Sequence, residues 1–282
     1  MKNKPLDLMT VNELVDLFIT DQSNVLIALK KQKKNITKAV SETKRHLDKG
    51  GRVVYIGAGT SGRIGLLDAV ECKPTFSTDK FIGIIAGGEK AFIQAKEGSE
   101  DNEKDAIKDL KKIKLNSKDI LIAIAASGET PYTISAIKYA KKLKVKTIGI
   151  SSTRSSSLSK ISDYSIPTEL GKEIIQGSSR LKSGTIQKII LNMISSISMI
   201  KSGKVFNDLM VDVQPTNKKL VKRAISIISS ICKISFQEAE RIFCASNKDI
   251  KVAITSYKKK LSIKDTKKLL SKKKHNLRSV IG

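Results

Sequence analysis

Tryptophan is absent from the 282 residues, and aromatic side chains together make up only 4% of the chain. Proteins that hold single-stranded nucleic acid stack the bases on aromatic side chains, so this chain lacks the platforms for such binding. The net charge of +26 nevertheless invites a nucleic-acid interpretation. Lysine supplies most of that charge and occurs in every segment instead of in one stripe. We therefore attribute it to solvated faces, including the densest basic run at 257–275, and expect no nucleic acid partner.

Cysteine and histidine are scarce as well. Cys72, Cys232 and Cys244 are scattered, which suits a reducing cytoplasm better than a disulfide framework. Neither His46 nor His275 lies near a pair of cysteines, so we expect no structural zinc and no other metal. No apolar run reaches the roughly 18 residues that span a bilayer, and the N-terminus lacks the apolar core of a signal peptide. These absences predict a cytoplasmic protein without a membrane partner.

Alternating strand-like and helix-like segments occupy the middle of the chain. The short β-branched runs are 52–57, 81–88, 119–127 and 146–151, with a further candidate strand at 164–168. The helical patterns between them are 62–71, 90–112 and 131–143. This alternation predicts an α/β fold, with a parallel sheet sandwiched between flanking helices.

Helical patterns precede and follow this region. Residues 10–48 are predicted to be helical, with Thr10 and Glu13 forming a capping box at the start. From about residue 216 onward the strand pattern stops and short helices are expected. We therefore divide the chain into N-terminal helices (1–49), a central domain (50–215) and a small all-helical C-terminal module (216–282).

Three loops rich in small polar residues carry the candidate chemistry. They are residues 59–63, 126–131 and 177–185. Each offers backbone N–H groups and hydroxyls at the start of a predicted helix, which is the arrangement that holds a phosphate. The candidate substrate-binding residues are Thr60, Ser61, Ser127, Gly128, Thr130, Ser178 and Ser179.

The first loop also matches the dinucleotide pattern G-x-G-x-x-G through Gly57, Gly59 and Gly62. A dinucleotide fold places an acidic residue at the end of its second strand, but here that strand ends at 86–88 and Glu89 comes only afterwards. A dinucleotide site also does not require two further Ser/Thr-Gly loops, whereas a site for a compact phosphosugar does require them. We therefore predict a phosphosugar site and no nucleotide cofactor.

Six separated motifs resemble, in the same order, those of the N-acetylmuramic acid 6-phosphate etherases. They are "GAGTSGRIGLLDAVECKPTF", "AGGEKAF", "KEGSEDN", "IAASGETPY", "GSSRLKSGTIQK" and "GKVFNDLMVDVQPTN". The resemblance implies a sugar isomerase (SIS) domain, a homodimer with sites near its interface, and no metal or nucleotide. The family usually has arginine where this chain has Glu129. A carboxylate beside a phosphate loop is tolerated only if it points away.

The resemblance also implies a reaction. The D-lactyl ether at C3 of N-acetylmuramic acid 6-phosphate is replaced by water, giving N-acetylglucosamine 6-phosphate and D-lactate. In the open-chain sugar a base removes the C2 proton beside the aldehyde, and lactate then leaves with help from a general acid. By resemblance Glu71 is the proton donor and Glu100 the base, with Glu97 or Asp101 as competing bases. A neutral acid at pH 7 needs a raised pKa, so we expect Glu71 to be partly desolvated.

Three further side chains near these motifs have open roles. Lys182 is a candidate charge partner for the phosphate. Arg63 holds the phosphate, holds the lactyl carboxylate, or forms a structural salt bridge, and Cys72 is interpreted as a packing residue. Two functional alternatives also stay open. One is a phosphosugar isomerase, and the other is a non-catalytic phosphosugar-binding regulator such as the glucokinase regulatory protein, which the motifs resemble too.

The long apolar segment 185–202 bears on assembly. Its isoleucines and methionines fall on more than one face of a helix. We expect the sheet to cover one face and a second chain, in a symmetric homodimer, to cover another. The alternative is burial of the whole helix within one chain.

Overall fold

The computed structural model describes residues 4–282. The chain divides into two compact units, a larger one of Met1–Ala69 and Lys80–Ile194 and a smaller one of Val70–Asp79 and Ser195–Gly282. The smaller unit therefore takes in more of the chain than the C-terminal module expected from residue 216 onward. None of the helices in the described range is both long and apolar enough to cross a membrane.

A five-stranded parallel sheet forms the centre of the larger unit. The strands are β1 (Val53–Gly57), β2 (Phe81–Ile85), β3 (Ile120–Ile124), β4 (Lys146–Ser151) and β5 (Tyr164–Pro167). Their order in the sheet is β2-β1-β3-β4-β5. Every residue of β1 and β3 is buried, as expected for apolar strands with helices on both faces. The sheet confirms the predicted α/β class, and each strand lies within a run predicted from the sequence.

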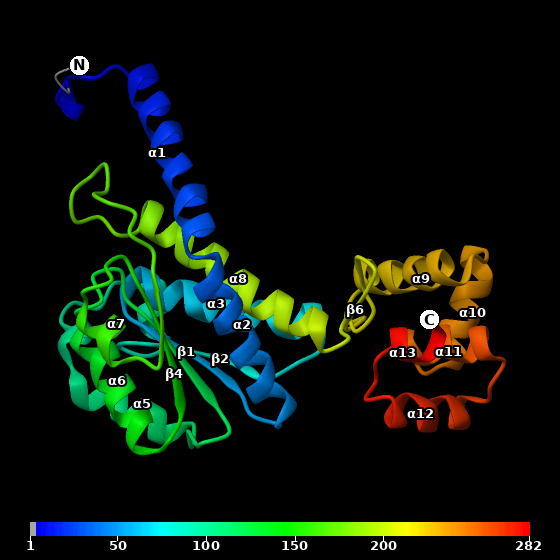
Figure 1. The fold of residues 1–282 in the computed structure, drawn as a ribbon. Coiled ribbons are helices and arrows are strands. Elements are labelled where there is room, and N and C mark those ends of the chain that lie inside the picture. Colours follow the sequence, from blue (N-terminus) through cyan, green and yellow to red (C-terminus); the bar gives the residue numbers. More distant parts are fainter. Residues whose placement is uncertain (1–3) are drawn as a thin grey trace. The chain divides into compact units, whose positions relative to one another are not determined.

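The helices of the larger unit flank this sheet (Figure 1). They are α1 (Val11–Lys31), α2 (Lys33–Asp48), α3 (Gly59–Phe76), α4 (Lys90–Ile93), α5 (Glu103–Lys112), α6 (Pro131–Lys142), α7 (Ser157–Ile161) and α8 (Lys182–Lys201), with 3-10 turns η1 (Leu6–Leu8) and η2 (Ser99–Asp101). The capping box predicted at the start of α1 is confirmed, because Thr10 and Glu13 exchange both hydrogen bonds. Both α3 and α8 extend beyond the boundary of the larger unit.

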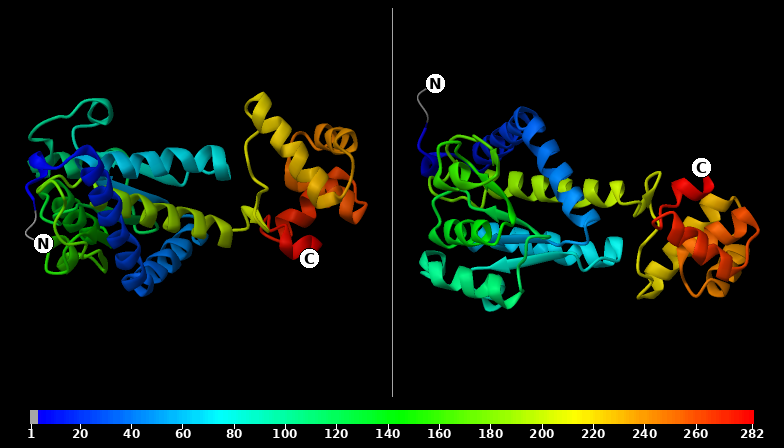
Figure 2. Two further views of the ribbon diagram at one scale, coloured as in Figure 1. Left: turned by 90° about the horizontal axis from the view of Figure 1, so that it is seen from above. Right: turned by 60° about the horizontal axis from the view of Figure 1, so that its bottom comes forward.

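Alternate residues of the central strands face different helices. Ile56 and Leu121 pack with residues of α5, α6 and α7 in one buried cluster. On the other face Gly65 of α3 lies against Tyr55 and Ile124, where an added Cβ would meet atoms at 3.1 and 3.2 Å. Helix α8 runs beside α3, as Figure 2 shows, and Asn192 donates to Asp68 across that contact at 2.6 Å. The sheet is thereby covered on both faces.

The single helix predicted over 90–112 is wrong. Helix α4 ends at Ile93, and α5 begins only at Glu103. Gly98 between them has a φ of +70°, a left-handed conformation that breaks the helix, and the Asn102 side chain accepts hydrogen bonds from two N–H groups at the start of α5. A loop over 94–102, including the turn η2, therefore replaces two helical turns. This loop carries Glu100.

Helix α8 buries most of its apolar residues within the chain. Ile186, Ile190 and Ile194 are all at most 1% exposed. This burial favours the interpretation in which the helix is buried within one chain over the interpretation in which a second chain covers a large apolar face of it. Ile200, near the end of α8, is exposed, and further exposed apolar side chains occur on other helices. Among them are Val11, Val15, Ile19, Leu26 and Ile27 on α1, which projects from the sheet in Figure 1, and Leu67 and Val70 on α3.

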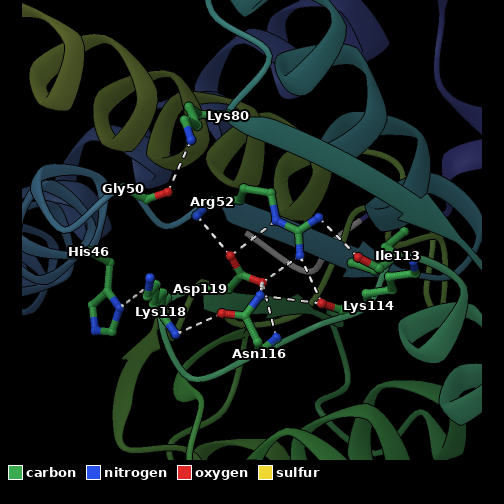
Figure 3. Close-up of polar contacts among 9 residues, drawn as sticks. All are labelled: His46, Gly50, Arg52, Lys80, Ile113, Lys114, Asn116, Lys118 and Asp119. Carbon is green, nitrogen blue, oxygen red and sulfur yellow. Dashed lines mark hydrogen bonds and ion pairs between the residues drawn. The ribbon is translucent and has the colours of Figure 1, made fainter.

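A cluster of polar contacts links the segments that precede β1 and β3, at the amino ends of these strands (Figure 3). Asp119 is buried and accepts hydrogen bonds from the backbone N–H of Arg52 at 2.9 Å and from its guanidinium at 2.6 Å. It also accepts one from the backbone N–H of Asn116. The hydrogen bond to Asp119 raises the pKa of Arg52 above its ordinary value. The cluster fixes the entries of β1 and β3 at the edge opposite their carboxyl ends.

The smaller unit has its own helical core. Its elements are the hairpin strands β6 (Val205–Phe206) and β7 (Leu209–Met210), and the helices α9 (Lys218–Cys232), α10 (Phe236–Ala245), α11 (Ile250–Lys259), α12 (Ile263–Lys272) and α13 (Arg278–Ile281). Ile228, Phe243 and Ile254 are buried together in its core. The short helices expected after residue 216 are confirmed.

Candidate active site

A cavity of about 440 Å³, here called the large pocket, opens at the carboxyl ends of β1, β3 and β4. Its lining comprises Ala58, Gly59, Thr60, Ser61, Glu100, Ile124, Ala125, Ala126, Ser127, Thr130, Ser152, Gly171, Glu173, Gly177, Ser179 and Ser183. β1 and β3 are neighbours in the sheet, and Gly57 pairs with Ile124, so the loops that follow them lie side by side. The strand order reverses between these strands, which is where open α/β sheets bind ligands.

The tight turn of the first loop accounts for the G-x-G-x-x-G pattern, so the pattern does not require a dinucleotide ligand. A Cβ on Gly57 would lie 2.8 Å from the backbone nitrogen of Gly62, and a Cβ on Gly62 would lie 2.6 Å from the carbonyl oxygen of Gly57. The strand therefore turns so tightly into α3 that neither position has space for a side chain. This turn places Thr60 and Ser61, both in the pocket lining, in the first turn of α3.

The second loop presents a hydroxyl donor. Ser127 Oγ accepts the backbone N–H of Glu129 at 3.1 Å, which leaves the Ser127 O–H free to donate to a ligand. Gly128 does not line the pocket but shapes the loop. It has a φ of +71°, and a Cβ there would lie 2.4 Å from Ser156 Oγ.

The Glu129 carboxylate is directed to the start of α7 and away from the phosphate loop, as a negative charge beside that loop has to be. The carboxylate accepts the backbone N–H of Ser157, the first residue of α7, at 2.8 Å. Hydrogen bonds from the Ser157 side chain and backbone lower the pKa of Glu129, so the group is held as an anion. Glu129 is not among the pocket-lining residues, whereas Ser127 and Thr130 on either side of it are. The carboxylate is occupied at the start of α7.

The third loop differs from the expectation in two of its residues. Ser179 lines the pocket, but Ser178 and Lys182 do not. The Lys182 side chain is buried, and its ammonium group forms an ion pair with Asp21 of α1 at 2.8 Å and also donates to the carbonyl oxygen of Lys172. Lys182 thus anchors α1 and the loop before α8, and its charge is already paired.

Glu173 is a residue of the site that the sequence did not indicate. Its carboxylate lines the large pocket and accepts the backbone N–H groups of Lys182 at 3.2 Å and Ser183 at 2.9 Å. It therefore caps α8 from a position nine residues before the helix begins. Capping residues are recognised in a sequence directly next to the helix, so no local pattern could have pointed to Glu173.

A second cavity of about 160 Å³, here called the small pocket, shares Gly59 and Glu100 with the large one. Its remaining lining is Arg63, Ala86, Ala91, Ala95, Lys96, Glu97, Gly98 and Ser99. Glu100 therefore lies between a cavity lined by hydroxyls and a cavity that contains two cations. Asp101, one of the competing bases, lines neither pocket.

Glu71 lies on α3, twelve residues after Gly59 and so just over three helical turns along. It belongs to the stretch of α3 assigned to the smaller unit, and neither pocket lining includes it. The sequence predicted a partly desolvated carboxyl, but in the single chain Glu71 is exposed. Leu67, four residues before Glu71, and Val70, directly before it, are exposed as well. Cys72 is buried, as expected of a packing residue.

The large pocket suits an anion held by neutral donors. Its lining includes the hydroxyl-bearing residues Thr60, Ser127 and Ser179 and no lysine or arginine. Two glutamates also line it, of which Glu173 is engaged by the backbone N–H groups at the start of α8 and Glu100 lies at the wall shared with the small pocket. Helices α3 and α6 both begin at the pocket, and their N-terminal N–H groups and dipoles favour negative charge there. Within residues 4–282 no cluster of His, Cys, Asp and Glu side chains is placed to hold a metal ion.

The fold and this pocket define a SIS-type α/β domain. A family model for the SIS domain matches residues 100–196, and one for the N-terminal SIS domain of the glucokinase regulatory protein matches residues 35–141. An Escherichia coli CFT073 protein solved in complex with A5P has the same fold (TM-score 0.53, 20% identity, 71% of this chain and 97% of that one). So has a phosphoheptose isomerase from Francisella tularensis (TM-score 0.51, 19% identity, 67% and 100%).

The chain belongs to the family of the N-acetylmuramic acid 6-phosphate etherases. A relative of that name from Francisella philomiragia is 53% identical over 251 residues, 88% of this chain and 85% of the relative. One from Francisella tularensis subsp. novicida is 50% identical over 266 residues (92% and 90%), and one from Staphylococcus aureus is 48% identical over 250 residues (88% and 84%). The family predicted from six motifs is therefore confirmed.

Replacing Ser127 by alanine should weaken the binding of a phosphosugar. A lost hydrogen bond to a charged group corresponds to about 1.5–3 kcal/mol, or roughly ten- to a hundred-fold in affinity. Titration calorimetry with N-acetylglucosamine 6-phosphate measures the effect. The exposed Ser155, outside both pocket linings, provides a control in Ser155→Ala. Equal affinities of Ser127→Ala and Ser155→Ala would place the phosphate elsewhere.

Proposed function

We propose that this protein cleaves the D-lactyl ether of N-acetylmuramic acid 6-phosphate, giving N-acetylglucosamine 6-phosphate and D-lactate. The observation that carries the proposal is the position of Glu100, a carboxylate shared by a hydroxyl-lined pocket and a smaller cationic one. A base in that position could reach C2 of a sugar whose phosphate is held in the large pocket. The relatives' names supply the substrate, and they suggest a role in the catabolism and recycling of cell-wall amino sugars.

The substrate is first bound through its phosphate group. We place this group against the hydroxyls of Thr60, Ser61, Ser127, Thr130 and Ser179 and the starts of α3 and α6. Hydroxyls and backbone N–H groups donate hydrogen bonds to the phosphate oxygens, and the start of each helix adds favourable potential. Ser178, Gly128 and Lys182 then serve the shape and anchoring of the loops.

Glu100 then removes the C2 proton of the open-chain sugar. The electron pair left at C2 is first held as the enolate of the C1 aldehyde. It then forms the C2–C3 double bond as the C3–O bond breaks, and the departing lactate oxygen takes a proton. Water adds to C3 of the unsaturated aldehyde while C2 regains a proton, which restores a saturated sugar. A positioned base or acid typically contributes about 10²–10⁴-fold to such steps.

We assign the proton for the lactate oxygen to Glu71, on the family resemblance. An exposed carboxyl is a poor general acid at neutral pH, and burial would raise its pKa. A homodimer that covers the exposed face of α3, with Leu67 and Val70, would bury Glu71 as well. Light scattering at micromolar concentration should therefore give a mass near twice 30.9 kDa. A monomer would contradict this assembly.

We place the protein in the cytoplasm. Its substrate and product are phosphorylated sugars, and within the described residues the three cysteines form no disulfide. The reaction as written needs no metal or nucleotide, since both proton transfers are within the chemistry of carboxylates.

One assay separates the three functions that the fold can support. The purified protein is incubated with N-acetylmuramic acid 6-phosphate, and D-lactate and N-acetylglucosamine 6-phosphate are quantified. The etherase releases both in equal amounts. A phosphosugar isomerase would move a proton between C1 and C2 without releasing D-lactate, and a regulator would bind the sugar without changing it. Either of these two results contradicts the proposal.

A further inference from the structure

The small pocket holds two cations, Arg63 and Lys96, that form no ion pair in the part of the chain that the structure describes. Arg63 comes from the second turn of α3, and Lys96 comes from the loop over 94–102. Over residues 4–282, neither side chain forms an ion pair with a carboxylate. This removes the structural salt bridge as an explanation for Arg63.

Arg63 is nevertheless held in place. Its Nε donates to the carbonyl oxygen of Phe92 at 3.0 Å, which orients the planar guanidinium. A guanidinium has four further N–H donors on its terminal nitrogens, arranged to meet a carboxylate with two parallel hydrogen bonds. In the part of the chain that the structure describes, those nitrogens have no hydrogen-bond partner. An oriented, unused pair of donors beside a second cation is suited to a carboxylate ligand.

Two carboxylates also line the small pocket, Glu97 and Glu100. Neither lies within ion-pair distance of Arg63 or Lys96 in the described chain, so the cations remain available to an incoming anion. The rest of the wall includes Ala86, Ala91 and Ala95, which offer apolar contact for a methyl group. A single water needs about 10–15 Å³ of such a cavity, so one of about 160 Å³ has room for a small organic acid.

We propose that the small pocket binds the lactyl group of the substrate, with Arg63 and Lys96 on its carboxylate and the alanines against its methyl. This inference rests on the proposed function. The phosphate in the large pocket and the carboxylate in the small one would hold the substrate at two ends. Its C2–C3 bond would then lie at the shared wall, next to Glu100. Arg63 and Lys96 select a phosphosugar that carries an acidic ether substituent over one that does not.

The test compares ligands with and without the lactyl carboxylate. Lys96→Met and Arg63→Gln should each raise KM for N-acetylmuramic acid 6-phosphate by about ten- to a hundred-fold. The inhibition constant of N-acetylglucosamine 6-phosphate, which lacks the lactyl group, should stay unchanged. Lys90→Met removes an exposed lysine of α4 that lines neither pocket, and it controls for the general loss of positive charge.

A substrate analogue sharpens the comparison. Converting the lactyl carboxylate to a carboxamide should lower kcat/KM of the unaltered protein to about the level of the variants, while the variants themselves should hardly distinguish acid from amide. Lys96 is exposed, so Lys96→Met keeps the test open if Arg63→Gln fails to fold.

Two results overturn the inference alone. One is an unaltered protein that releases D-lactate but treats acid and amide equally. The other is a pair of variants that lose affinity for N-acetylglucosamine 6-phosphate as strongly as for the substrate. Absence of D-lactate release by the unaltered protein would overturn the proposed function, and this inference with it.

Discussion

Glu100→Gln should lower the rate of D-lactate release by about 10²–10⁴-fold, because glutamine keeps the shape of the side chain but cannot accept the C2 proton. Binding of N-acetylglucosamine 6-phosphate should persist, since the hydroxyls of the large pocket are untouched. Steady-state kinetics and calorimetry measure the two quantities. Asp101→Asn is the matched control, as its carboxylate is the next in sequence but lines neither pocket. A strong loss in Asp101→Asn with normal rates in Glu100→Gln would reassign the base.

The same reaction followed in D₂O separates the base from the proton donor. Glu100→Gln should lose both lactate release and the exchange of the C2 proton with solvent. Glu71→Gln should lose lactate release but retain exchange at C2, because its base is intact. NMR of the recovered sugar reports the exchange. Loss of exchange in Glu71→Gln alone would mean that the two roles are reversed.

Asp119→Asn should destabilise the protein by about 3–5 kcal/mol, the typical consequence of removing one partner from a buried ion pair. Asp119 is 1% exposed and Arg52 is only partly exposed, so the guanidinium would stay in place without its counter-charge. Three further hydrogen bonds to Asp119 from Asn116 and the Arg52 backbone would also be weakened. Urea denaturation measures the change.

Asp48→Asn is the control for this variant. It removes an aspartate of the same charge from an exposed i,i+4 pair with Lys44, where the expected loss is within about 0.5 kcal/mol. The Arg52–Asp119 cluster lies at the opposite edge of the sheet from the large pocket, so KM of the folded Asp119→Asn protein should be unchanged. Equal stabilities of Asp119→Asn and Asp48→Asn would refute the structural role of the buried pair.

The sheet and most helices could be predicted from the sequence because their signals are local. The run at residues 120–124 is apolar throughout and has isoleucine at three of its five positions, which is typical of a strand covered on both faces. The break inside the predicted helix 90–112 is less visible. Residues 94–98 are compatible with a helix, and the left-handed Gly98 and the capping Asn102 decide against it.

The site was predictable where it consists of loops after strands. Thr60, Ser61, Ser127, Thr130 and Ser179 reach one pocket because neighbouring parallel strands end at one edge. The partner of Lys182 was not predictable, since Asp21 lies 161 residues away in sequence. The capping role of Glu173 and the sharing of Glu100 by two pockets likewise depend on tertiary packing that no local pattern encodes.

The most direct measurement is the fate of solvent oxygen during turnover of N-acetylmuramic acid 6-phosphate in H₂¹⁸O. Elimination followed by addition of water breaks the bond between C3 and the ether oxygen. The label should therefore appear at C3 of N-acetylglucosamine 6-phosphate, and the released D-lactate should carry none in its hydroxyl group. Mass spectrometry of both products after complete conversion reads the result. Label in the hydroxyl of lactate and none at C3 would mean that the other ether bond breaks, and this would contradict the proposed reaction and the role of Glu100 in it.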